Sequence, residues 1–381
     1  MSADLYAGIE KAAAGGQADA AFELLERKFL EDGNYPMLFE LRLMKTRQRL
    51  GLPLIQTEAF AELPEDKRRA YDEGCIAAAR ETGSLFLARG DILRAWPYFR
   101  AIGENAPVAE AIEKAEAGDG IESVIEIAFQ ERVNPRRGFE LILQQFGICR
   151  AITLFDAYPV AAGREECLRL LARTLHRELI ENLKRVVAQR EGSAPETGRI
   201  PELIAGRDWL FGEYDYYVDT SHLASILRFA LDAKDVETLR LALEFTEYGK
   251  RLSTQFSFRG EPPFEDTYAD HAMYLRAVLG EGAAEAVAHF RRKAEAAEEG
   301  DTIAAQVLVG LLVRLGRYGD AIEVSRAHLG QCDASQLGCP PVVQLCQQAG
   351  DFDQLERIAR EKGDLLSFAA AALQRQRKGV A

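Results

Sequence analysis

Long hydrophobic runs are missing from this chain of 381 residues. Purely apolar stretches such as 307–309 and 311–313 fall far short of the ~20 residues that a membrane-spanning helix needs. The first residues also lack a basic region followed by an apolar core, so they do not resemble a secretory signal. We therefore expect a cytoplasmic protein that has no membrane partner.

Cysteine is scarce, with six residues scattered along the chain. This number and spacing do not form a disulfide framework, and we expect reduced thiols. Cys332, Cys339 and Cys346 are seven residues apart, whereas zinc ligands usually occur in pairs two to four residues apart. Seven residues are two helical turns, so this spacing predicts a buried stripe on one helix.

Basic residues are outnumbered, since 47 lysines and arginines face 60 aspartates and glutamates and give a net charge of −13. A surface of this charge repels phosphate backbones unless it carries a local basic stripe. The arginine and lysine groups are interleaved with glutamate or apolar residues. A nucleic-acid partner is therefore not expected.

Strand patterns are nearly absent, because runs of Val, Ile and Thr bounded by Asn-Gly or Asp-Gly turns do not occur. Apolar residues recur instead at helical spacing along the whole chain. One such series predicts a hairpin with Leu25 and Phe29 on its first helix and Leu38 and Leu41 on its second. The fold class predicted is all-α, built from stacked antiparallel helical hairpins.

One kind of turn repeats along the chain. Gly, a polar residue and an apolar residue follow one another at 90–92, 316–318 and 350–352. Glycine suits the left-handed position that ends a helix, and the apolar residue packs back as the next helix begins. The last two of these glycines are 34 residues apart, which is the spacing of a helical-hairpin repeat.

The stretch 76–109 resembles a tetratricopeptide repeat, and 302–369 resembles two more units less closely. The matching positions of the first stretch are the small and aromatic residues, the turn, the second helix and the closing proline: Gly83, Phe86, Gly90, Ile92, Ala95, Phe99 and Pro107. The resemblance implies an α-solenoid that is irregular in the middle, and a surface that receives a peptide or protein partner.

Three segments are expected from this pattern: hairpin repeats at 1–120, an irregular helical segment at 121–280, and tetratricopeptide-like repeats at 281–381. In the middle segment, 208–220 and 251–270 are rich in aromatic and acidic residues. Long loops of this kind inside a helical protein are usually functional. A functional site is therefore expected within 208–271.

Phosphate loops, dinucleotide fingerprints, nucleophile elbows and zincin motifs are all missing. The remaining chemistry-bearing residues are a polar set in the middle segment: Asp215, Asp219, His222, Asp266, Asp270 and His271, with His176 as an addition. Histidine and carboxylate ligands suit a divalent ion such as zinc, and Asp219, His222, His271 and His176 are its candidate ligands. The alternative is that Asp219 caps a helix and that the histidines lie on ordinary helix faces.

Aromatic and basic side chains give a second set of candidates. Trp209, Tyr214 and Tyr217 could line a ligand or partner surface, or could pack an irregular loop onto the helices. Arg228, with Arg240, Arg251 and Arg259, could hold an anionic group, or could pair with the abundant glutamates.

Two functions stay open on the sequence alone. The first is a scaffold that binds a peptide or protein. The second is a metal-dependent hydrolase or isomerase whose pocket is formed by the 208–271 loops, with Tyr216 or Glu265 as acid–base. An enzyme requires at least three of these side chains to meet at one point, whereas a scaffold has them dispersed.

Overall fold

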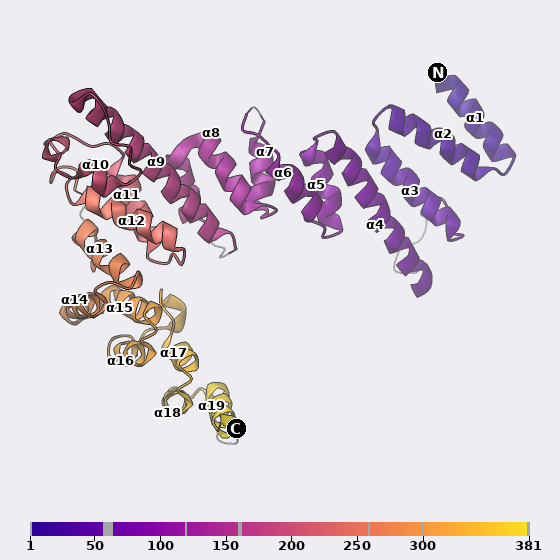
Figure 1. Ribbon diagram of the computed structural model, residues 1–381. Coiled ribbons are helices and arrows are strands. Elements are labelled where there is room, and N and C mark those ends of the chain that lie inside the picture. Colours follow the sequence, from indigo (N-terminus) through magenta and orange to yellow (C-terminus); the bar gives the residue numbers. More distant parts are fainter. Residues whose placement is uncertain are drawn as a thin grey trace. The chain divides into compact units, whose positions relative to one another are not determined.

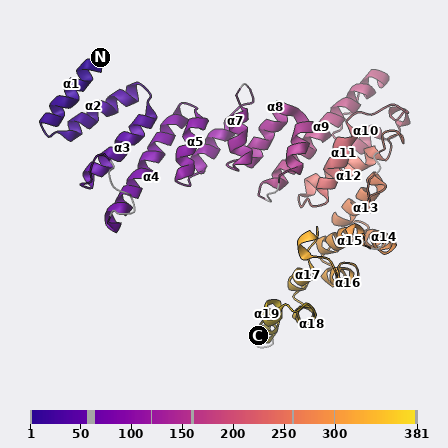
Figure 2. The same ribbon diagram turned by 180° about the vertical axis from the view of Figure 1, so that it is seen from behind.

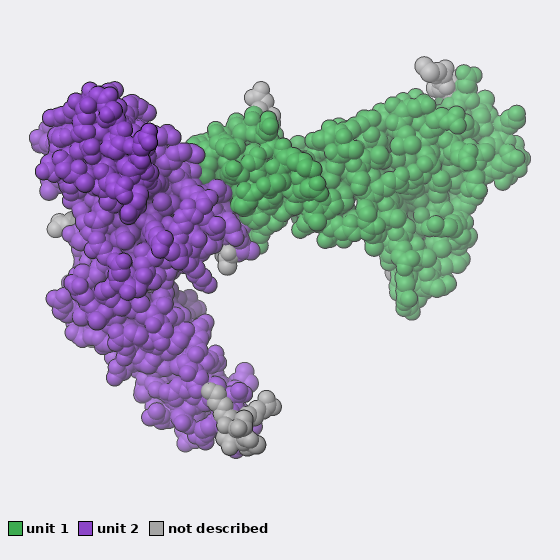
Figure 3. Space-filling view, in the orientation of Figure 1, with its two compact units in different colours: residues 1–147 green, residues 148–381 purple. Residues whose placement is uncertain are grey.

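A computed structural model describes residues 2–55, 64–118, 120–158, 162–257, 260–298 and 300–378. Within those ranges the chain forms nineteen α-helices, and no strand is longer than one bridged residue at Asp266. The fold class expected from the sequence is confirmed. Contacts divide the chain into two compact units, residues 1–147 and 148–381 (Figure 3).

Unit 1 is a succession of helices in which each packs against its neighbours in sequence (Figures 1 and 2). Its core is formed by apolar side chains that these helices turn towards one another, among them Phe22, Leu38, Leu41 and Phe99. The predicted first hairpin is therefore correct. The helices are α1 (Ser2–Ala14), α2 (Ala18–Glu31), α3 (Tyr35–Arg49), α4 (Glu65–Ala88), α5 (Ile92–Ala101), α6 (Ala106–Glu113) and α7 (Glu122–Ile125), which continues into a π-helical turn, Glu126–Gln130.

The α4–α5 hairpin shows how local sequence sets this geometry. Gly90 has a φ of +74° and ends α4, and the Asp91 carboxylate then accepts the Arg94 backbone N–H at 3.0 Å to begin α5. A Cβ added to Gly83 would lie 2.6 Å from Phe99 Cε2, so the two helices approach more closely than any larger residue permits. The small, turn and aromatic positions noted in the sequence therefore form a tight helical hairpin.

Helix α8 (Pro135–Asp156) changes direction at a glycine. Gly147 has φ +76° and ψ 180°, a backbone conformation that only glycine adopts readily. The ladder of helical hydrogen bonds is therefore interrupted at the residue where the first unit ends.

Unit 2 begins with the second part of α8 and a long helix, α9 (Arg164–Glu191). Helix α9 packs against α11 and α12, and from α11 onward every helix packs against the next. The remaining elements are α10 (Ile200–Ile204), a 3-10 turn (Asp208–Leu210), α11 (Thr220–Ala230), α12 (Val236–Gly249), α13 (Thr267–Val278), α14 (Ala283–Ala296), α15 (Ile303–Arg314), α16 (Tyr318–His328), a 3-10 turn (Ala334–Gln336), α17 (Val342–Ala349), α18 (Phe352–Lys362) and α19 (Leu365–Lys378). Each unit is thus a stack of helical hairpins of the α-solenoid kind.

The repeated turns lie where the sequence placed them. Gly316 and Gly350 have φ values of +70° and +67° and end α15 and α17. The stripe predicted for the cysteines is only partly correct. Cys346 lies on α17, but Cys332 and Cys339 lie in the connection before it, and all three pack against one apolar core.

The three segments expected from the sequence were defined by the regularity of their repeats. The two units are defined by the contacts within each of them. The boundary between units falls at Gly147, inside the expected middle segment. The segments 1–120, 121–280 and 281–381 stay a proposal about repeat types. No helix in the described ranges is long and apolar enough to cross a membrane.

Candidate functional site

The four residues expected to bind a metal are divided among three helices: Asp219 and His222 belong to α11, His176 to α9 and His271 to α13. Asp219 caps α11, where its carboxylate accepts the backbone N–H of Ser221 at 2.8 Å and the hydroxyl of Ser221 at 2.6 Å. His222 is half-buried in the first turn of α11. On α9, His176 Nε2 lies 3.0 Å from a Glu244 carboxylate oxygen of α12.

These residues are not brought together. In the ranges that the structure describes, no group of three or more His, Cys, Asp or Glu side chains has the arrangement needed for a metal ion. The hydroxyl and amide of Ser221 hold the Asp219 carboxylate and keep its pKa below the ordinary value. Capping accounts for Asp219, and the metal site stays a prediction without geometric support.

The aromatic candidates separate into packed and exposed residues. The Arg190 guanidinium covers the ring of Trp209 at 4.4 Å, and the Tyr217 hydroxyl donates to the Leu210 carbonyl at 2.9 Å. Tyr214 and Tyr216 are 69% and 53% exposed. Loop packing therefore accounts for Trp209 and Tyr217, whereas Tyr214 and Tyr216 keep more than half of their surface exposed.

Two of the arginine candidates form ion pairs. Arg228 lies 3.1 Å from Asp156, and Arg251 pairs with Asp208. Arg240 is exposed on α12. Arg259 lies outside the described residues.

A groove between α11 and α13 brings several candidates to one place. It has a volume of about 540 Å³ and is closed on one side by residues 260–264. Its apolar lining is Ala224, Leu231, Pro262 and Phe264. Its polar lining is Ser221, Ser225, Arg228, Glu261, Thr267 and His271. Cavities of this size with apolar walls and a few polar groups are typical of ligand sites.

His271 lines this groove from α13. It is 4% exposed, and its ring stacks on Phe264 with centroids 4.2 Å apart. Its Nδ1 lies 2.6 Å from the Thr267 carbonyl oxygen. Burial lowers the pKa of His271 to about 4, so the imidazole is neutral at physiological pH.

A buried ionic network fixes the loop that closes the groove. Asp270 is 4% exposed, and its two carboxylate oxygens lie 2.7 Å from His289 Nε2 and 2.8 Å from Lys293 Nζ. Lys293 also donates to the Pro263 carbonyl and to Glu265, both in the connection before α13. Helix α14 therefore holds residues 263–265 in place through one ammonium group.

The contacts of this network change the pKa values of Lys293 and Glu265 in opposite directions. Partial burial opposes the charge of Lys293, but its hydrogen bonds to Asp270 and Glu265 raise its pKa above the ordinary value. The hydrogen bond from Lys293 lowers the pKa of Glu265. Glu265, expected as an acid–base group, is thus an ionised partner of Lys293.

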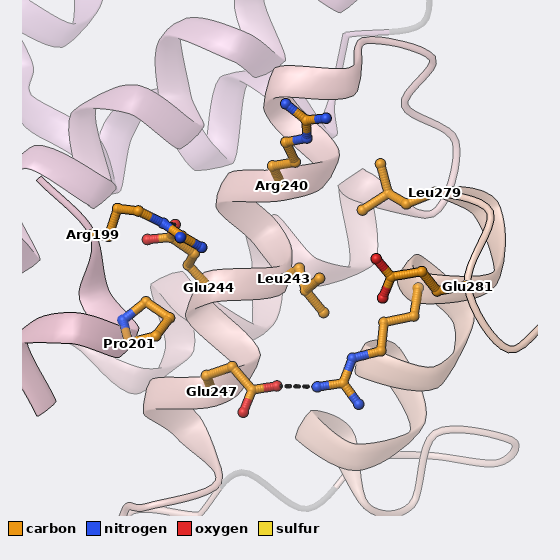
Figure 4. Close-up of a pocket in the computed structure, with 9 residues that line it drawn as sticks. Arg199, Pro201, Arg240, Leu243, Glu244, Glu247, Leu279 and Glu281 are labelled. Carbon is orange, nitrogen blue, oxygen red and sulfur yellow. Dashed lines mark hydrogen bonds and ion pairs between the residues drawn. The ribbon is translucent and has the colours of Figure 1, made fainter. Parts of the chain in front are cut away.

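A second concavity of about 490 Å³ lies between α10, α12 and α13 (Figure 4). Four of its charged groups form two ion pairs: Arg276 bonds to Glu247 at 2.7 Å, and Arg199 to Glu244 at 3.1 Å. Glu244 also accepts the Ile200 backbone N–H at 2.9 Å. Because the lining has three arginines and three glutamates, its charges balance, and it selects neither an anion nor a cation.

Sequence reasoning missed several residues of the α11–α13 groove. Ser221 and Ser225 were missed, although they are spaced by four and three residues from each other and from the candidate Arg228 and so share one face of α11, a signal that the sequence contains. Phe264 and Lys293 gave no such signal, because they join the site only through the packing of α13 against α14.

Comparisons with known proteins do not assign a family. No protein-family model matches the chain, and no curated protein matches it. A solved structure described as a "Circular tandem repeat protein with novel repeat topology and enhanced subunit contact surfaces" is 16% identical. The match covers 99% of this chain and 97% of that chain, with a TM-score of 0.17, and nothing about this chain's function follows from it.

Proposed function

We propose that this chain is a scaffold of the tetratricopeptide kind that binds a peptide or protein partner in the groove between α11 and α13. The single observation that carries the proposal is this groove, an open concavity of about 540 Å³ that is lined by both apolar and polar side chains. Stacked helical hairpins commonly use such concave surfaces for extended segments of a partner.

The tetratricopeptide assignment is supported by the α4–α5 hairpin. Its small residue at the crossing, its left-handed glycine and its buried aromatic residue occur at the positions of that family's motif. The following proline, Pro107, occupies the first turn of α6. These features specify a fold and not an activity. The binding role is supported by the groove between α11 and α13.

A binding site is favoured over a metal-dependent enzyme by the contacts of the candidate catalytic groups. Glu265 is engaged by Lys293, and the ring of Tyr216 packs against Phe256 with centroids 4.8 Å apart. Among the described residues, neither side chain is hydrogen-bonded to His222 or His271. The polar side chains that line the groove suit hydrogen bonding to a peptide partner.

Selection of random peptides displayed on phage against the full chain tests this function. The selected peptides are then titrated against the wild-type protein and against Ala224→Trp, in which an indole occupies the groove. Ala224 is half-buried on α11. The matched control is Ala77→Trp, at an exposed position of α4.

The expected result is that Ala224→Trp weakens binding at least tenfold and that Ala77→Trp leaves it unchanged. The proposal fails if no peptide binds the full chain more tightly than about 1 mM. It also fails if the two variants bind the selected peptides equally well, because the contact surface then lies elsewhere.

A further inference from the structure

His271 offers an unused hydrogen-bond acceptor to the α11–α13 groove. A carbonyl oxygen only accepts, so the contact between Nδ1 and the Thr267 carbonyl places the imidazole proton on Nδ1. In a neutral ring, Nε2 then carries a lone pair. Among the described residues no hydrogen bond reaches this Nε2.

The walls around that acceptor are suited to a flat apolar group. Phe264 stacks on the imidazole with an interplanar angle of 30°. Ala224, Leu231 and Pro262 complete the apolar lining. The volume of about 540 Å³ exceeds that of one aromatic side chain and leaves room for the adjoining backbone.

A second polar group near the floor is also without a partner. The Thr267 side chain is 3% exposed and its hydroxyl makes no hydrogen bond. It lies against Gly260, where an added Cβ would be 2.7 Å from the hydroxyl oxygen. This oxygen has almost no accessible surface, so it forms part of the wall, and the hydrogen bond that can distinguish one ligand from another is the one to His271.

The charges at the edge of the groove do not select an anion. Arg228 already has Asp156 as its partner, and Glu261 contributes a negative charge to the same lining. The acceptor itself is an uncharged ring nitrogen. The ligand class that fits is therefore aromatic, uncharged and equipped with a polar hydrogen.

We propose that this groove recognises an aromatic side chain that carries a ring N–H or O–H, tryptophan or tyrosine, and that His271 Nε2 accepts that hydrogen. This inference rests on the proposed function, because it names the residue of the peptide partner that enters the groove. Phenylalanine fills the same space but leaves Nε2 desolvated and unpaired, which disfavours it.

Ligand-observed NMR titrations of the full chain test the inference with four small probes. These are the N-acetyl amides of tryptophan, 1-methyltryptophan, tyrosine and phenylalanine. We expect tryptophan to bind about fivefold or more tightly than 1-methyltryptophan, and tyrosine to bind more tightly than phenylalanine by a similar factor.

Two variants locate the effect. In His271→Phe the preference for a polar hydrogen is expected to disappear, because the ring is kept and the acceptor is removed. If that variant does not fold, Ala224→Trp supplies the test, since it blocks the groove from its α11 side and is expected to abolish binding of all four probes.

Equal binding of tryptophan and 1-methyltryptophan, or of tyrosine and phenylalanine, overturns the inference. So does a preference that survives in Ala224→Trp, because the probes then bind elsewhere. Failure of the proposed function is recognised separately: it is the absence of phage-selected peptides that depend on the groove. Groove-dependent peptides whose tryptophan or tyrosine can be changed to phenylalanine without loss overturn the inference alone.

Discussion

The hairpin of α4 with α5 and the crossing of α12 with α13 are both built around a glycine. Gly83 brings α4 against Phe99, which is fully buried, and Gly249 ends α12 against the buried ring of Tyr268. In the first case a turn of three residues, 89–91, joins the helices. In the second case the connection is residues 250–266, and part of it forms the wall of the groove.

This difference decides where a groove can form. A short turn leaves no surplus chain between α4 and α5 to line a groove. The longer connection gives the α12–α13 crossing residues that are not needed for the crossing itself. These residues, fixed by Lys293 of α14, supply Pro262 and Phe264 to the groove.

The largest expected effect is that of Gly249→Ala, which adds a methyl group where α12 crosses α13 next to the groove. The added Cβ would lie 2.1 Å from two atoms of the Tyr268 ring, and a buried ring has little room to move. We expect a loss of about 3 kcal/mol in the free energy of unfolding, measured by urea denaturation, and about 2 kcal/mol for Gly83→Ala.

The control for this pair is Gly310→Ala in α15, where nothing lies within 4 Å of the added Cβ. Alanine there is expected to stabilise the helix by up to about 1 kcal/mol. A similar change in all three variants would mean that helix propensity, and not close approach, decides the effect.

The next largest effect is a pH dependence at the groove. The folded pKa of His271 is about 4 because of burial, below the ordinary value of 6.5, so between these values the unfolded chain binds a proton that the folded chain does not. Stability is therefore complete above pH 6.5 and decreases by about 2–3 kcal/mol as the pH falls to 4. His271→Asn, which cannot titrate, is expected to remove this contribution when the free energy of unfolding is measured between pH 4 and 7. If the variant and the wild-type protein show the same pH dependence, His271 is not buried as a neutral imidazole.

A smaller pH dependence of stability is expected in unit 1, over a lower pH range. The Arg42 hydrogen bond lowers the pKa of Glu26 from 4.5 to about 2. Because the folded pKa is depressed, the stabilisation is present above pH 4.5 and is lost as the pH falls to 2. The pair is partly solvated, so we expect only about 1 kcal/mol, measured as the difference between the wild-type protein and Glu26→Gln over that range. Loss of the same stability near pH 6 would assign it to another group.

The smallest effect is expected for His222→Ala, at a residue that the sequence suggested as a metal ligand. Because His222 is half-buried in the first turn of α11, its removal is expected to change the free energy of unfolding by less than about 0.5 kcal/mol. Elemental analysis of untagged protein is expected to give the same metal content for both forms. Near-stoichiometric metal that the variant loses would restore the enzyme alternative.

What the sequence determined by itself is the set of helices and their short turns. The period of Leu25, Phe29, Leu38 and Leu41 predicted the first hairpin, and Asp219 was foreseen as a possible cap. Such features depend on hydrogen bonds and contacts between residues at most four apart in sequence, and these patterns are visible in one dimension.

Only the tertiary structure decided which side chains meet. Asp270 was noted beside His271, yet its partners are His289 and Lys293, 19 and 23 residues away, while His176 meets Glu244, 68 residues away. Those pairings depend on which faces of successive helices pack together and on close approaches such as that of Gly249 to Tyr268. Linear spacing carries no information about helix crossings, so the sequence indicated the region of the groove and two of its residues, Arg228 and His271, but not the others that form it.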